Sequence, residues 1–181
     1  MKTTIETERL LLRAFSAEDA PAYYPLCVIP EVIRYVGNKP MASVDEVRAG
    51  LLEGPIADYR KYGFGRFAVI WKETGQLIGF SGLKYMPAFA EVELGYRLLP
   101  EFWGRGLASE AGQASVGFAR DALNLSRLIG IVHPDNQGSA HVLQKLGFRI
   151  EKQVRMELIP GLDLNLFARE IALPGPPSRS C

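Results

Sequence analysis

Short apolar runs and alternating polar and apolar positions predict strands along most of the chain. Two of these runs flank Glu73–Thr74–Gly75, a turn-rich spacer that is typical of an antiparallel hairpin. A third ends at Pro100, because proline has no N–H group to donate to a sheet, and the last two are joined through Pro160–Gly161. The predicted strands are Glu8–Phe15, Phe64–Lys72, Gln76–Met86, Glu91–Leu99, Arg127–His133, Phe148–Leu158 and Leu162–Leu173.

Apolar residues spaced three and four apart predict helices between these strands. Ser16 with Asp19, and Ser43 with Glu46, are typical of helix N-termini. Gly54–Pro55 is expected to bend or break the helix that follows Ser43. The predicted helices are Ala17–Leu26, a short helix between Pro30 and Gly37, a longer one from Ser43 toward Tyr62, Gly106–Leu123 and Asn136–Leu146.

The order of these elements is one strand, helices, three strands, a helix, a strand, a helix and two strands. This order predicts a mixed α/β layer with helix-linked crossovers between its central strands. The 181 residues fit one ordinary domain, and 48% hydrophobic with 23% charged residues exclude wholesale disorder. We expect the domain to span residues 1–173 and the Pro-rich tail, 174–181, to be disordered because it cannot bury itself.

The charge and the cysteine content argue against several classes of protein, namely nucleic-acid binders, disulfide-rich proteins and zinc proteins. The net charge is +1, whereas a general nucleic-acid binder is usually far more basic, so no nucleic-acid partner is expected. Cys27 and Cys181 cannot make a disulfide framework or a zinc site, and neither histidine has a partner at ligand spacing, so no metal is expected. Met1–Arg13 lacks a signal-peptide pattern, and no apolar run is long enough to span a bilayer. These features predict a cytoplasmic domain without a membrane partner.

The strongest local signal for chemistry is the segment from Pro100 to Ala108, which runs from a strand directly into a helix. Gly104 and Gly106 allow a tight turn, and the first N–H groups of a helix attract anions such as phosphate. Arg105 could add a charge-assisted contact. The alternative is that the two glycines only make a sharp turn. The segment completes neither GxGxxG nor GxxxxGK[ST], which favours a diphosphate on a different scaffold.

A second candidate segment begins at the predicted strand end at His133 and enters a helix through Asn136 and Ser139. An asparagine side chain both donates and accepts, which suits an amide-bearing ligand arm, and the serine hydroxyl is a further donor. The alternative is that Asn136 or Ser139 only caps the helix.

Together these segments resemble the GCN5-related N-acetyltransferases, or GNAT enzymes. The resemblance rests on ELGYRLLPEFWGRGLASEA, on the later NQGSAHVLQKLGF and on the opening TERLLLRAFSAEDA, which occur in the family order. The first and last of these are similar to the ribosomal-protein alanine/serine N-acetyltransferase branch. The resemblance implies the GNAT fold, a mixed and mostly antiparallel sheet of about seven strands flanked by helices. It also implies a splay between the strands Glu91–Leu99 and Arg127–His133.

The resemblance implies acetyl-CoA as co-substrate, with its diphosphate on the amides of the glycine loop and its pantetheine arm along the preceding strand. The first position of that loop usually holds Gln or Arg, whereas this chain has Trp103, as the branch does. The implied cofactor-binding residues are Leu98, Leu99, Trp103, Gly104, Arg105, Gly106, Leu107, Ala108, Ser109, Asn136, Ser139 and Lys145.

The family reaction is direct attack of a neutral amine on the thioester. Glu93 is the candidate base, and Glu91 is its rival because strand alternation places both on one face. Both can equally be solvated carboxylates, and an α-amine is partly neutral without a base. The tyrosine that many GNAT enzymes use as acid is replaced by Leu143, so Ser139 is the substitute, with Tyr96 as a further hydroxyl.

The acceptor implied by the resemblance is a primary amine, first the N-terminal amine of a protein or peptide. A small-molecule amine, such as a polyamine, drug or metabolite, is the second candidate, and a non-catalytic CoA-binding module is the third. An acidic open cleft favours a peptide and a closed aromatic pocket favours a small amine. The segment Pro25–Met41 and the hairpin Pro160–Asp163 are expected to border the acceptor site. The resemblance also allows a homodimer.

Overall fold

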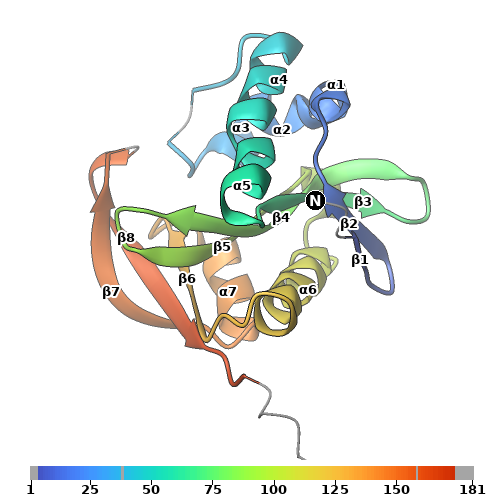
Figure 1. The fold of residues 1–181 in the computed structure, drawn as a ribbon. Helices are drawn as coiled ribbons and strands as arrows, with labels where there is room; N and C mark the ends of the chain where they lie inside the picture. Colours follow the sequence, from blue (N-terminus) through green and yellow to red (C-terminus); the bar gives the residue numbers. More distant parts are fainter. Residues whose placement is uncertain (1–3, 38, 158, 174–181) are drawn as a thin grey trace, which may run out of the picture.

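An eight-stranded sheet runs through the molecule in the computed structural model, which describes residues 4–37, 39–157 and 159–173 (Figure 1). The strands lie in the order β1-β2-β3-β4-β5-β6-β8-β7. Neighbouring strands are antiparallel, except that β5 and β6 are parallel. The strands are β1 Thr4–Glu6, β2 Leu10–Ala14, β3 Arg66–Trp71, β4 Gln76–Met86, β5 Glu91–Leu98, β6 Arg127–Val132, β7 Arg149–Met156 and β8 Ile159–Glu170.

Helices cover both faces of this sheet. The helices α1 to α5 lie on one face, and α6 and α7 lie on the other (Figure 1). Their bounds are α1 Ala20–Tyr23, α2 Pro25–Val28, α3 Pro30–Ile33, α4 Val44–Glu53, α5 Pro55–Tyr62, α6 Leu107–Asp121 and α7 Gln137–Lys145, with the 3₁₀ turns η1 Ala17–Asp19 and η2 Pro100–Phe102. No helix in the described ranges is long and apolar enough to cross a bilayer.

The central strands β5 and β6 separate along their length. β4 and β5 are in register over eight residue pairs, whereas the described part of β5 and β6 has one registered pair, Glu93 with Ile129. Beyond that pair the carboxyl ends of both strands lack sheet partners on their facing sides. This opening is the splay that the sequence resemblance implied.

Alternation along β5 sorts its side chains between the two helical layers. Val92 and Leu94 are buried in a cluster with residues of α6 and α7. Since successive side chains of a strand point to opposite faces, Glu91, Glu93 and Arg97 face the α1–α5 layer. The acidic and basic residues of the central strand are therefore on the side away from α6.

The sequence-based element boundaries hold with three corrections. The sheet has one strand more than the seven expected, because β1 has three residues, too few to show a pattern. The predicted helix Ala17–Leu26 is divided into η1, α1 and α2, because Pro25 cannot continue α1 and starts a new turn. Pro160 and Gly161 lie within β8 and not between the last two strands. The predicted strand end at Leu158 and the tail 174–181 lie outside the described residues.

Candidate active site

The loop between β5 and α6 presents a row of backbone N–H groups. Gly104 has φ = 70° and Gly106 has φ = 76°, and a Cβ atom at Gly104 would meet nothing within 4 Å, so glycine is required there for its conformation and not for space. Among the described residues, no acceptor bonds to the six amides from Gly104 to Ser109. The Trp103 amide is different, since it donates to the Pro100 carbonyl at 3.0 Å.

These six amides fit a diphosphate. They surround the N-terminus of the 15-residue helix α6, where the helix dipole adds partial positive charge. Gly104, Arg105 and Gly106 are exposed, so their amides are accessible to a ligand, and a phosphate oxygen is an acceptor that suits several N–H donors at once. The predicted anion site requires free N–H donors, and the loop provides them from Gly104 to Ser109 but not at Trp103.

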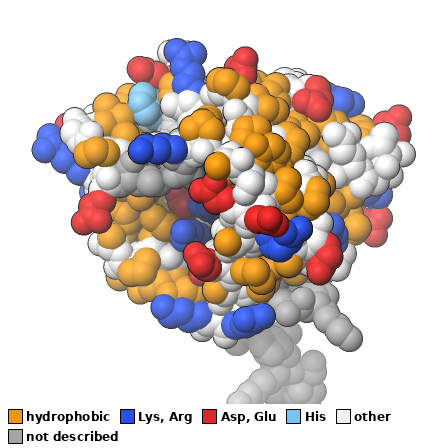
Figure 2. All heavy atoms as spheres, turned by 90° about the horizontal axis from the view of Figure 1, so that it is seen from above, with side chains coloured by type: hydrophobic (Ala, Val, Ile, Leu, Met, Phe, Trp, Pro, Cys, Tyr) orange, Lys and Arg blue, Asp and Glu red, His pale blue; other side chains and the backbone are white. Residues whose placement is uncertain are grey.

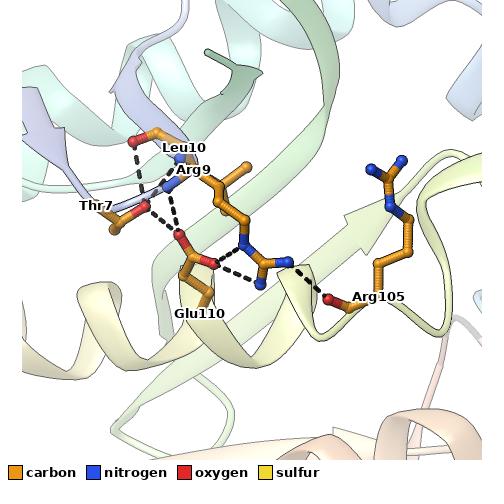
Figure 3. A network of polar contacts seen from close by, with 5 residues as sticks. All are labelled: Thr7, Arg9, Leu10, Arg105 and Glu110. Carbon is orange, nitrogen blue, oxygen red and sulfur yellow. Dashed lines mark hydrogen bonds and ion pairs between the residues drawn. The ribbon is translucent and has the colours of Figure 1, made fainter. Parts of the chain in front are cut away.

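A polar network holds this loop against the start of the chain (Figure 3). Glu110, in the first turn of α6, accepts hydrogen bonds from Thr7 Oγ1 at 2.6 Å, the Arg9 amide at 2.9 Å and Arg9 Nε at 2.7 Å. Arg9 Nη1 in turn donates to the Arg105 carbonyl at 3.0 Å. The burial of Glu110 alone would raise its pKa, but the bonds from Thr7 and Arg9 outweigh burial and lower it. The carboxylate therefore stays charged and clamps the loop.

Two side chains of the loop lie on the protein itself. The indole Nε1 of Trp103 donates to the Leu98 carbonyl at 2.8 Å, and this side chain is still 48% exposed. The Arg105 guanidinium carbon lies 4.8 Å from the Trp71 ring centroid and 5.5 Å from that of Phe102. Both contacts leave the backbone of the loop as the accessible surface. They also mean that neither side chain is aimed at the row of free amides.

The two residues predicted to hold the pantetheine arm differ in what they offer. The Leu98 carbonyl already accepts from Trp103, and the Leu99 amide donates to the Ile78 carbonyl at 2.8 Å within the sheet. Both side chains are buried in the core. A cofactor arm along this strand would therefore meet backbone groups that face the splay, and the Leu99 amide is not one of them.

The hydroxyls of Tyr96 and Ser139 meet between β5 and the first turn of α7. Tyr96 Oη donates to the Ser139 carbonyl at 2.7 Å, and its oxygen lies 3.1 Å from Ser139 Oγ. Burial raises the pKa of Tyr96 to about 12, so its hydroxyl stays protonated at neutral pH. Leu143, at the position of the family tyrosine, is 1% exposed and cannot replace that hydroxyl.

Asn136 and Lys145 lie at opposite ends of α7. Asn136 Oδ1 accepts from the Ser139 amide at 3.1 Å and thereby caps α7. This is the capping alternative that the sequence left open. Lys145 is exposed in the last turn of α7 and is available to a ligand that extends along that helix.

The structure separates the two candidate carboxylates. Glu91 bonds to Arg127 Nε at 2.9 Å, and Arg127 also binds Glu151 and Glu170, each at 2.7 Å. Glu93 is 12% exposed and has one ion pair, from Oε2 to Arg66 Nη2 at 3.0 Å. Glu91 therefore belongs to a surface ion cluster, whereas Glu93 lies against Arg66, which lines the cavity described next.

A cavity of about 220 Å³ lies between the sheet and the layer of α1 to α5. Seen from the side of these helices, the surface is hollowed, with basic and acidic side chains around the opening (Figure 2). The segment Pro25–Met41, which was predicted to border the acceptor site, contributes Cys27, Ile33, Lys39 and Met41 to the wall. Aromatic residues of the wall are Phe15, Tyr23 and Phe80.

With this geometry established, residues 9–149 match the family model described as the acetyltransferase (GNAT) domain. The chain belongs to the GNAT acetyltransferase family. Its relative YoaA, an uncharacterized N-acetyltransferase of Bacillus subtilis, is 33% identical over 152 residues, which cover 83% of this chain and 85% of that one. Spermidine N(1)-acetyltransferase of Escherichia coli K12 is 28% identical over 147 residues, 81% of this chain and 76% of that one.

Solved structures show the same GNAT fold. An acetyltransferase from Agrobacterium tumefaciens C58 superposes with a TM-score of 0.81 at 30% identity, over 94% of this chain and 96% of that one. A ribosomal L7/L12 α-N-protein acetyltransferase in complex with coenzyme A has a TM-score of 0.79 at 22% identity, over 93% of this chain and 98% of that one. The predicted family, fold and N-acetyltransferase activity are confirmed.

Sequence reasoning about this GNAT enzyme missed the basic residues of the cavity and the loop clamp. Arg97 follows Glu93 at an even spacing, so strand alternation could have placed both on one face. Arg66 begins the strand β3, and only the register of β3, β4 and β5 brings it to Glu93. Glu110 looked like a helical surface residue, and its partners at Thr7 and Arg9 are far away in the sequence.

His133 is held by its neighbours at the end of β6. His133 Nδ1 accepts from the Asp135 amide at 3.1 Å, and its ring centroid lies 5.0 Å from that of Tyr35. This contact ties the segment after α3 to the end of β6. Within the described ranges, no group of three or more His, Cys, Asp or Glu is placed to hold a metal ion.

Proposed function

We propose that this enzyme transfers an acetyl group from acetyl-CoA to a small primary amine. The observation that carries the proposal is an arrangement across the sheet. The six free amides of Gly104–Ser109 lie at the carboxyl end of β5, and an aromatic-walled cavity lies on its other side next to Glu93. A thioester held at the splay would thus be reached from the cavity.

The amides from Gly104 to Ser109 are the groups proposed to hold the diphosphate, and Lys145 is placed for the nucleotide end. When bound, acetyl-CoA supplies the activated acetyl group as a thioester. β5 and β6 share one described pair, Glu93 with Ile129, and the proposed place of the extended arm is the opening that follows this pair. Leu107 and Ala108 contribute through their backbone amides. The side chain of Leu107 is buried in the core and is not available to a ligand.

Glu93 is the proposed proton acceptor for the attacking amine. It lies beside the cavity and has a single cationic partner, whereas Glu91 is bound to Arg127. The hydroxyl pair of Tyr96 and Ser139 is the proposed source of the proton for the departing thiolate. The Tyr96 hydroxyl keeps its proton at neutral pH, and the pair flanks the splay on the α7 side.

The cavity favours a small amine over a peptide. Its volume of about 220 Å³ lies below the ~300–1,000 Å³ of pockets for drug-sized ligands, and three aromatic rings, those of Phe15, Tyr23 and Phe80, form part of its wall. A peptide N-terminal amine is the second candidate. It is favoured by the resemblance of the segment from Trp103 to Ala111 to the ribosomal-protein branch.

Two measurements test the proposal. Coenzyme A should raise the melting temperature, and mass spectrometry should detect acetylated products when acetyl-CoA is incubated with a panel of small amines and N-terminal peptides. Glu93→Gln should lower kcat about 10-fold or more while coenzyme A still binds, and Glu91→Gln should leave kcat close to the unmodified value. Binding of coenzyme A without transfer to any amine would instead establish a CoA-binding module.

A further inference from the structure

The charged residues of the cavity wall are predominantly basic. Four of the residues that line it carry positive charge, and Asp58 is the acidic one. The basic residues are Lys39, Arg66, Lys84 and Arg97. Such a wall repels cationic ligands and attracts anionic ones, most strongly where water is partly excluded.

Two guanidinium groups lie around one aromatic ring in this cavity. The Arg66 guanidinium carbon is 4.8 Å from the Phe80 ring centroid, and that of Arg97 is 5.5 Å from it. Arg66 is fixed further by its bond to Glu93. Its Nε is buried and has no hydrogen-bond partner in the described part of the chain.

The sheet is built to hold the Arg66 side chain in this place. Gly82 of β4 and Gly95 of β5 lie in register beside Arg66, so the three residues form a row across three strands. A Cβ atom at Gly95 would lie 3.0 Å from Arg66 Nη2. The absence of a side chain at Gly95 thus lets the guanidinium lie over β5 and reach Glu93.

Arg97 is the one partly buried arginine of the described residues whose guanidinium has neither an ion pair nor a hydrogen bond to the protein, since even Arg169, which lacks a carboxylate partner, donates to the Leu146 carbonyl. Arg13 and Arg127 have carboxylate partners at 2.6 Å and at 2.7–2.9 Å, whereas no carboxylate of the described residues lies within ion-pair distance of Arg97. Burial lowers the pKa of Arg97, and the charge of Arg66 lowers it further. Arg66 is balanced by Glu93, so Arg97 is the guanidinium that faces the cavity without a compensating anion among the described residues. A buried charge without a partner is a cost that a bound anion would remove.

Resting on the function proposed above, we propose that the acceptor carries a carboxylate next to its amine, as an α-amino acid does. Arg97 binds the carboxylate through its guanidinium, which matches that group with two parallel N–H donors. The amine then lies toward Glu93, which is joined to the same cavity through Arg66. The positive wall also favours the neutral form of the amine, which is the form that attacks a thioester. A polyamine lacks the anion and adds positive charge to this wall.

Matched pairs of acceptors test this assignment. Methionine, phenylalanine and glutamate are compared with their α-carboxamides, which keep the amine and the side chain but remove the carboxylate charge. Spermidine is the cationic comparison. A C-terminally amidated dipeptide with aspartate in second place has an acidic side chain but no free α-carboxylate, so it separates the two kinds of anion. We expect kcat/KM for at least one amino acid to exceed that of its amide by at least ~10-fold, and spermidine to be a poor acceptor.

Variants assign the preference to Arg97. Arg97→Gln should abolish the preference for the acid over the amide while KM for acetyl-CoA stays the same, and Arg97→Lys should restore part of it. Arg120→Gln is the control, because Arg120 is exposed on α6 and pairs with its neighbour Asp121. Thermal melting of each variant shows that it is folded.

The outcomes separate this inference from the proposed function. Amides or spermidine that react as well as the acids, or an Arg97→Gln variant that keeps the preference, would overturn the inference while acetyl transfer stands. If no amine is acetylated, the proposed function fails. Calorimetry in the presence of coenzyme A then measures whether the pocket binds an amino acid more tightly than its amide. Binding of an amino acid that is at least ~10-fold tighter than binding of its amide supports the anion site, and equal or absent binding refutes it.

Discussion

Replacement of Glu110 by glutamine tests whether the clamp on the glycine loop stabilises the fold and prepares the loop for coenzyme A. Oε1 of Glu110 accepts from Thr7 and the Arg9 amide, and Oε2 accepts from Arg9 Nε. A glutamine can keep the first two bonds with its carbonyl oxygen. Its NH₂ group then faces the Arg9 guanidinium, which is a contact of two donors. The substitution thus removes the bonds to the guanidinium and little else.

The expected cost of Glu110→Gln is about 2 kcal/mol. The Arg9 side chain is 37% exposed, so solvent screening limits the ion-pair part to ~0–1 kcal/mol. Loss of the hydrogen bond from Arg9 Nε to the carboxylate adds ~1.5 kcal/mol, the lower end of the range for bonds to charged groups. For a chain of this size, about 2 kcal/mol corresponds to a loss of ~4–8 °C in Tm. Because Arg9 also holds the Arg105 carbonyl, KM for acetyl-CoA should rise by about 3- to 10-fold.

The stabilisation that Glu110 provides should depend on pH in one direction only. The pKa of Glu110 is lower in the folded chain than in the unfolded chain, so its contribution is complete above the unfolded value of ~4.3. It is lost as the pH falls through the lowered folded value. The difference in stability between the unmodified enzyme and Glu110→Gln should therefore be constant near neutral pH and shrink below about pH 4.

Urea denaturation at several pH values measures this difference, and Asp121→Asn is the control on the same helix. Asp121 is exposed and pairs with Arg120, so its loss should change the stability far less than the loss of Glu110 does. Equal losses for the two variants, or a Glu110 effect that is unchanged at pH 3, would refute the clamp.

Three further changes have outcomes fixed by local geometry. Gly104→Ala should destabilise the fold by ~1–2 kcal/mol in urea denaturation and weaken coenzyme A binding, because φ = 70° disfavours a side chain, whereas Gly117→Ala within α6 should stabilise it. Tyr96→Phe should lower kcat several-fold in steady-state assays with a smaller change in KM, because it removes the hydroxyl held against α7. Burial raises the pKa of Asp19, but the bonds from Arg13 and the Ser16 amide outweigh burial and lower it. Asp19→Asn should therefore cost ~1–2 kcal/mol at pH 7 and less below about pH 4, measured by acid titration of unfolding.

The parts of the site that could be predicted from the sequence are those encoded by neighbouring residues. Pro100, Gly104 and Gly106 identify a strand end, a tight turn and a helix start within a few positions, so the loop and its free amides follow from local rules. Asn136 before Ser139 likewise predicts the cap that the structure contains. Local patterns succeed here because the backbone conformation alone creates the site.

The basic wall of the cavity could not be predicted in this way, because it depends on the register of three strands. Arg66 reaches Glu93 only because Gly82 and Gly95 lie beside it on the next two strands. A shift of one residue in either pairing would turn Arg66 or Glu93 to the opposite face. The helix break at Pro25 was missed for a related reason, since the apolar pattern around it continues through the break.

The two carboxylates of β5 show how one strand face can serve both stability and chemistry. Glu91 shares Arg127 with two other carboxylates, so its charge is balanced within the protein and a ligand has nothing to add. Glu93 balances Arg66 at the cavity wall, whereas Arg97 in the same wall has no carboxylate partner among the described residues, so its charge is balanced only when an anion enters. An acceptor with a carboxylate would neutralise that excess as it brings its amine toward Glu93. Selection of the acceptor and placement of its amine would then come from the same electrostatic imbalance.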